Sequence, residues 1–63
     1  MLWLSEILLQ EHELVSFDQL LVSVKRRAGE GEMFFRIDVK PPFKDTPVDW
    51  EDRLEAAFSS AAR

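Results

Sequence analysis

The last third of the chain has the clearest helical periodicity. Its apolar residues recur three and four positions apart and would share one helical face: Trp50, Leu54, Ala57, Phe58 and Ala61. The preceding Thr46-Pro47-Val48-Asp49 is typical of a helix start, because Thr caps, Pro suits the first helical position and an acid three residues after the cap closes a capping box. We therefore predict a helix over residues 47–61.

Residues 33–40 alternate with a period of two, which indicates a strand. Met33, Phe35, Ile37 and Val39 form one face, and Phe34, Arg36, Asp38 and Lys40 form the other. Pro41-Pro42 ends the strand, because neither residue donates a hydrogen bond to a neighbouring strand.

Residues 16–28 fit two structures. As a helix, the segment has Ser16 as cap, Gln19 as the closing residue of a capping box and a basic last turn followed by Gly29. As a strand, it alternates over Leu20–Lys25 and would form a hairpin with residues 33–40. A lone strand needs a hydrogen-bonded partner, and a hairpin supplies one within the chain, so we favour the hairpin.

Residues 2–12 are expected to form a further helix, with Leu4, Ile7 and Leu8 on its apolar side. The predicted fold is therefore one α+β domain over residues 1–63, a helix–β-hairpin–helix (α-β-β-α). The alternative is α-α-β-α, either winged-helix-like or completed by strand pairing in a dimer.

Composition and charge exclude several classes of protein. The 63 residues are 46% hydrophobic and 32% charged, which is too apolar for a disordered chain. No stretch reaches the roughly 18 apolar residues of a membrane span, and we expect no membrane association. There is no Cys, which excludes disulfides and fits a cytoplasmic location. The net charge is −4, but residues 20–44 carry a net positive charge between two acidic ends.

No constellation for catalysis or metal binding is present. The single His12 lies between Glu11 and Glu13, but adjacent helix residues do not converge on one point, so we interpret this triplet as a solvated helix end. Gly29 and Gly31 lack the Lys of a phosphate-binding loop. We therefore predict a non-enzymatic protein with no catalytic residues, no cofactor and no metal.

The strongest basic feature is Lys25-Arg26-Arg27. If residues 16–28 were the second helix of a helix-turn-helix, these cations would lie near DNA phosphates, with residues 33–40 as a wing. The acidic total charge argues against nucleic acid as the partner. DNA binding through these three residues is the alternative function, and a homodimeric structural subunit is the other.

The leading hypothesis is a small acidic protein-interaction module, with two kinds of contact residue. Aromatic side chains beside cations are typical of interface hot spots, and acidic side chains of the last helix would dock on a basic, even nucleic-acid-binding, protein. The candidate residues are Phe34, Arg36, Lys40, Phe43, Glu51, Asp52 and Glu55. In class and size only, such a module matches inhibitors or neutralisers of larger complexes made by mobile elements, such as anti-CRISPR proteins.

Overall fold

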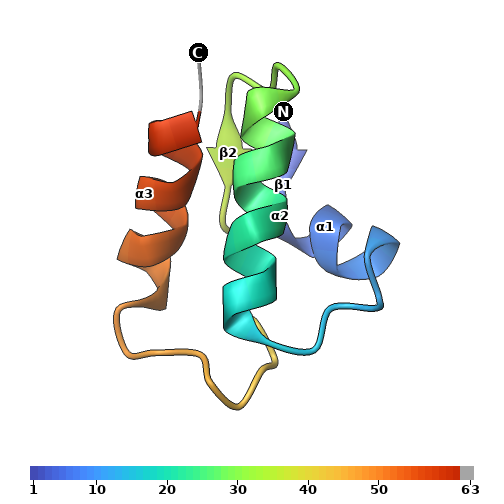
Figure 1. Cartoon of the computed structure of the whole chain (residues 1–63), viewed down its shortest axis with the longest axis vertical. Helices are drawn as coiled ribbons and strands as arrows, with labels where there is room; N and C mark the ends of the chain where they lie inside the picture. Colours follow the sequence, from blue (N-terminus) through green and yellow to red (C-terminus); the bar gives the residue numbers. More distant parts are fainter. Residues whose placement is uncertain (62–63) are drawn as a thin grey trace.

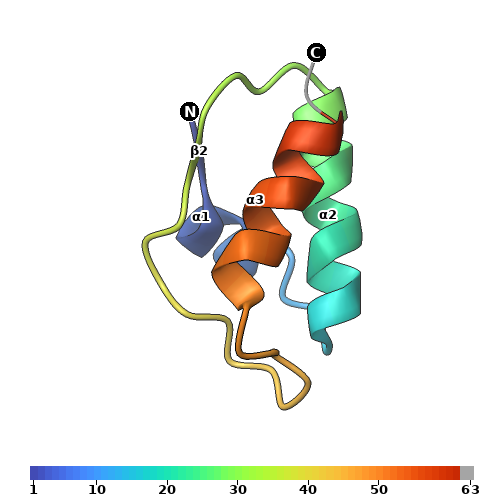
Figure 2. The same ribbon diagram turned by 90° about the vertical axis from the view of Figure 1, so that its left-hand side faces the viewer.

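Two helices, α2 (Phe17–Gly29) and α3 (Trp50–Ala61), lie side by side and run in the same direction in the computed structural model, which describes residues 1–61 (Figures 1 and 2). These two helices supply most of the buried apolar residues: Phe17, Leu20, Val24, Ala28, Leu54, Ala57 and Phe58. Burial of a large aliphatic or aromatic side chain contributes roughly 1.5–3 kcal/mol, so the core that the two helices share with the N-terminal segment and β2 is the main source of stability.

The α+β class is confirmed, but residues 16–28 are helical, so the element order follows the alternative prediction and not the hairpin. One half of the predicted capping box is present, since the Gln19 N–H donates to Ser16 Oγ at 3.2 Å. The Gln19 side chain reaches one residue further back than a capping box requires, and Gln19 Oε1 accepts the Val15 N–H at 2.8 Å. Local capping and an amphipathic face therefore decide the structure of this segment.

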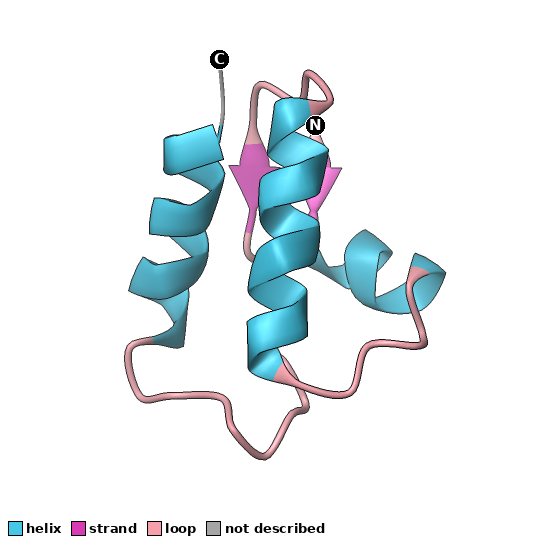
Figure 3. Ribbon diagram, viewed as in Figure 1, coloured by secondary structure: helices cyan, strands magenta, loops and turns pink. Residues whose placement is uncertain are grey.

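The two strands are short and parallel (Figure 3). β1 (Leu2–Trp3) pairs with β2 (Phe35–Arg36), with Leu2 opposite Phe35 and Trp3 opposite Arg36. The strand predicted over residues 33–40 is thus reduced to two residues, and the N-terminus of the same chain supplies its partner. β2 therefore needs no partner strand from residues 16–28 or from a second chain.

Because Leu2 and Trp3 are extended, the first helix starts later than predicted, and α1 covers only Leu4–Gln10. No side chain of its own N-terminal segment caps this helix. Instead, Asp38 accepts hydrogen bonds from the Ser5 N–H at 3.1 Å and from Ser5 Oγ at 2.6 Å. These hydrogen bonds hold the pKa of Asp38 below its usual range.

The long connector between β2 and α3 is held by a second cap. Asp45 Oδ1 accepts the Phe17 N–H at 2.8 Å, which satisfies one free donor at the start of α2. Two carboxylates of one connector, Asp38 and Asp45, thus cap two different helices. This arrangement fixes the path of the chain from the strand layer back to the helix layer.

Helix α3 begins three residues later than predicted. The Thr46 hydroxyl contacts the Pro41 carbonyl at 3.5 Å and does not cap the helix. The Asp49 carbonyl accepts the Arg53 N–H at 3.1 Å, so regular helical bonding starts there. The delay arises because residues 47–50 form a separate turn, with the Trp50 N–H donating to the Pro47 carbonyl at 3.2 Å.

Candidate functional site

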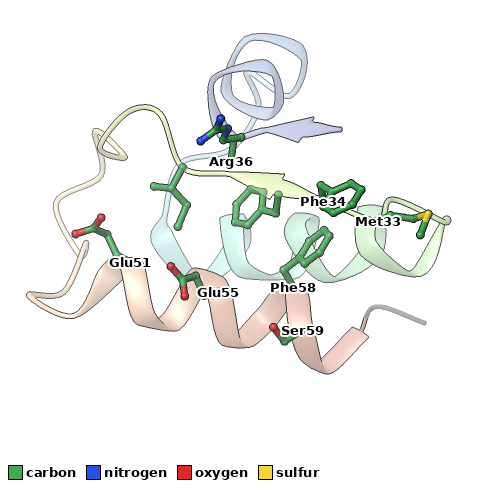
Figure 4. A pocket seen from close by; sticks show the side chains of 9 residues that line it. Met33, Phe34, Arg36, Glu51, Glu55, Phe58 and Ser59 are labelled. Atoms are coloured by element: carbon green, nitrogen blue, oxygen red, sulfur yellow. The ribbon is translucent and has the colours of Figure 1, made fainter.

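A groove of about 450 Å³ lies between the segment that carries β2 and helix α3 (Figure 4). Residues of the strand segment form one wall and residues of the helix form the other. The complete lining consists of Met33, Phe34, Phe35, Arg36, Ile37, Glu51, Glu55, Phe58 and Ser59.

Inward packing of alternate residues builds the floor of this groove. The Phe35 ring stacks on the Phe58 ring of α3, with centroids 5.2 Å apart and an angle of 16° between the planes. Ile37, two residues later, also packs on the core. Since successive strand residues point to opposite sides, Phe34 and Arg36 are excluded from that packing.

One end of the groove is apolar and open to solvent. Met33 and Phe34 expose 76% and 63% of their surface, although both are large hydrophobic residues. In Figure 4 they lie at the same end of the groove as Phe58. Two adjacent exposed apolar side chains beside a partly accessible aromatic ring are a recognisable composition for a binding surface.

The other end is acidic. Glu51 and Glu55 are exposed on successive turns of α3 and extend toward the groove (Figure 4). Within residues 1–61, neither carboxylate forms an ion pair, since the four ion pairs of that range involve other acids. The nearby Arg36 guanidinium lies 5.8 Å from the centre of the Trp3 ring, a cation–π contact.

Four of the seven predicted binding residues line this groove: Phe34, Arg36, Glu51 and Glu55. The other three do not. Phe43 packs against the core, and Lys40 and Asp52 are exposed elsewhere.

Five lining residues were not among the predicted binding residues: Met33, Phe35, Ile37, Phe58 and Ser59. Met33 belongs to the same alternating face as Phe35 and Ile37, yet it precedes β2 and is largely exposed. The glycine at position 31 was the sequence signal that the strand had not yet begun, and the structure places Gly31 at a φ of +109°.

The basic run Lys25-Arg26-Arg27, the alternative DNA-binding site, is largely engaged in contacts within the chain. Arg26 Nη2 donates to Glu11 Oε1 at 2.7 Å, and Arg27 Nε donates to Glu11 Oε2 at 3.2 Å. Ser23 Oγ also donates to Glu11 Oε1 at 2.7 Å, and Arg27 Nη2 donates to Gln10 Oε1 at 2.9 Å. We call these five side chains the Glu11 network. Two of the three cations are thus engaged within the chain.

Glu11 is 9% exposed, so its interpretation as part of a solvated helix end is wrong. Burial alone would raise the pKa of this carboxyl. The Ser23 hydrogen bond and the Arg26 and Arg27 charges outweigh burial and lower the pKa below its ordinary value of 4.5. The residue is therefore an ionised anchor between α1 and α2.

Lys25 points away from this network. It lies beside a separate shallow groove between α2 and α3, together with Arg53 and the small residues Ala56, Ala57 and Ser60. The predicted basic triplet is therefore divided between two sides of α2.

The described part of the chain contains no cluster of metal-binding side chains. His12 is exposed, and residues 1–61 contain no group of three His, Cys, Asp or Glu side chains that converges on one point. None of the helices within that range is long and apolar enough to cross a bilayer.

Comparison of the chain with protein-family models, with curated proteins and with solved structures found no match. The geometry and chemistry of the groove are therefore the basis for inferring a function.

Proposed function

We propose that this protein is a non-enzymatic interaction module that binds another protein through the groove between β2 and α3. The observation that carries the proposal is that exposed Met33 and Phe34 line the same groove as Glu51 and Glu55, which form no ion pair within residues 1–61. Within residues 1–61, none of these four side chains belongs to the hydrophobic core or packs against it.

The chemistry of the groove favours a protein partner. An apolar centre with a polar rim is the usual composition of protein–protein interfaces, and an exposed aromatic contributes contact area at a low entropy cost. The carboxylates select a partner that is basic at the contact, including a protein that itself binds nucleic acid. A module of this size acts by covering a surface, which is how an inhibitor of a larger complex works.

Direct nucleic-acid binding is the weaker proposal. Phosphate contacts require free cations, and Arg26 and Arg27 already neutralise Glu11 at 2.7 Å and 3.0 Å. Breaking these pairs would leave a buried carboxylate with no compensating charge, held only by the Ser23 hydroxyl. We place the module in the cytoplasm, because a chain without Cys is compatible with a reducing compartment.

Site-specific photo-crosslinking tests the proposal. A photo-reactive phenylalanine analogue replaces Phe34 in one sample and Val48 in another, and both are irradiated in lysate of the source organism after nuclease treatment. Val48 is the matched control, because it is fully exposed and does not line the groove.

The expected result is one discrete crosslinked protein at position 34 that is absent at position 48. Competition with unlabelled wild type should suppress the crosslink, whereas the Phe34→Ser variant should compete at least tenfold less well. Equal crosslinking at the two positions, or equal competition by Phe34→Ser, would contradict the proposal.

A further inference from the structure

The free edge of β2 borders the groove. The Leu2 N–H donates to the Phe34 carbonyl at 2.8 Å, so Phe34 directs its carbonyl toward β1. Backbone groups of successive strand residues face opposite edges, and in a parallel pair only one of the two opposed residues is bonded to its neighbour. The N–H and C=O of Phe35 therefore face away from β1, at the open edge.

The strand layer is too narrow for the helix layer beneath it. Neighbouring strands lie about 4.8 Å apart, whereas packed helices lie about 8–10 Å apart. Two strands therefore cover α2 and the junction with α3, as Figures 1 and 2 show, and the groove runs along the uncovered side of α3. A third strand beside β2 would lie in this groove.

The charges along α3 indicate what such a strand should carry. Glu51 and Glu55 lie four residues apart in α3, which corresponds to about 6 Å along the helix axis. Residues two apart on one face of a strand are separated by about 6.7 Å. The axis of α3 and the axis of β2 have nearly the same orientation in Figure 1. The spacing of the two carboxylates along the helix therefore matches the spacing of alternate side chains along a strand that lies in the groove.

The apolar end gives the next position. Beyond Glu55, the helix wall of the groove continues with Phe58 and Ser59, and the strand wall with Phe34 and Met33. A strand residue two positions after the second cation would reach this end. Arg36 does not compensate the carboxylates, because it stacks on Trp3 and forms no ion pair within residues 1–61.

We propose that the occupant of the groove is an extended segment of another protein that adds as a strand to the Phe35 edge of β2. The segment carries Lys or Arg at two alternate positions, facing Glu51 and Glu55, and an apolar side chain two residues further on, facing Phe58 at the end of the groove where Met33 and Phe34 are exposed. This inference rests on the proposed function and specifies its mode of recognition. Strand addition takes affinity from the backbone and specificity from alternate side chains.

The test uses the full chain and a fluorescent nine-residue peptide with Lys at its third and fifth positions, Leu at its seventh and Thr or Val elsewhere. Fluorescence anisotropy at low salt should show saturable binding. Glu51→Gln combined with Glu55→Gln should weaken it at least tenfold. Asp52→Asn is the matched control, since Asp52 is an exposed acid of α3 outside the groove, and should change binding less than twofold.

Two further readouts separate strand addition from simple side-chain docking. N-methylation of one alternate set of peptide amides should abolish binding, whereas methylation of the other set should leave it within twofold. Hydrogen exchange of the Phe35 amide should slow at least tenfold in the complex.

Several results would overturn this inference. They are no binding at millimolar peptide, insensitivity to N-methylation in both sets, or a dimer of the chain that the peptide does not displace. If peptide binding is insensitive to N-methylation but still depends on Glu51 and Glu55, strand addition is wrong and the proposed function still holds. If no discrete protein is crosslinked at position 34, in contrast, the proposed function itself is wrong.

Discussion

The Glu11 network and the β2–α3 groove both concentrate charged side chains, but they use them in opposite ways. In the network, one buried carboxylate receives hydrogen bonds from Ser23, Arg26 and Arg27, and no buried polar side-chain atom among residues 1–61 is left without a partner. In the groove, two exposed carboxylates have no cation within the same residues, and large apolar side chains face solvent.

This difference separates charges that hold the fold from charges that are available to a partner. A satisfied, buried group is costly to disturb, whereas an exposed, unpaired group contributes little to folding. Substitutions in the two regions should therefore affect different measurements.

The largest effect is expected for Glu11→Ala. The change leaves Ser23 and two guanidinium groups without their acceptor, and we expect a loss of about 2 kcal/mol in the free energy of unfolding. The loss is below that of a fully buried pair because the Arg26 side chain is 55% exposed. Urea unfolding measures it, with the exposed neighbour Glu13→Ala as control. A loss equal to that of the control would remove the distinction between the two regions.

Acidification should abolish the advantage that Glu11 provides over Gln. Its pKa is lowered in the folded state, so its stabilisation is fully present above the unfolded value of about 4.5 and is lost as the pH falls through the folded value. The difference in unfolding free energy between wild type and Glu11→Gln should be constant from pH 7 to about pH 5 and shrink below it. A difference that grows on acidification would show that the ionised form is not the stabilising one.

A smaller effect is expected for Asp45→Ala, which removes the cap from the Phe17 N–H. The expected cost is about 1 kcal/mol, typical of a lost helix cap. Thermal unfolding measures this cost, and Lys44→Ala, an exposed neighbour, is the control. Because the connector also supports the strand wall of the groove, peptide binding should weaken as well. Unchanged stability and unchanged binding would mean that the connector is held by other contacts.

The smallest effect on stability is expected in the groove. Met33→Ser and Phe34→Ser should each change the free energy of unfolding by less than about 0.5 kcal/mol, since both side chains are mostly exposed. The same variants should lose crosslinking or peptide binding. A destabilisation comparable to that of Glu11→Ala would place these residues in the core and invalidate the comparison.

Local signals made much of the helical structure predictable. The Ser16 cap of α2, the apolar face of α2 and the apolar face of α3 each depend on residues within a few positions of one another. The preference for a hairpin over that helix came from the correct requirement that a strand needs a partner. The partner is β1, whose two residues are too few to show a recognisable alternation in the sequence.

The candidate site was predictable in part. Phe34, Arg36, Glu51 and Glu55 were identified by residue type and alternation, and they do line one groove. That they face each other across β2 and α3 depends on how the connector returns the chain, which no local pattern specifies. The same holds for Glu11, whose partners lie 12 to 16 positions away.

By itself, the sequence determined the α+β class, helix α3 and the residue types available for binding, because these follow from short-range periodicity and capping. For α2 it supplied a cap and an apolar face but left helix and strand as alternatives. The tertiary structure decided the pairing of Leu2 with Phe35, the capping of α1 and α2 by Asp38 and Asp45, and the engagement of Arg26 and Arg27 by Glu11. These contacts join residues distant in sequence, and only the packing of the elements brings such residues within hydrogen-bonding distance.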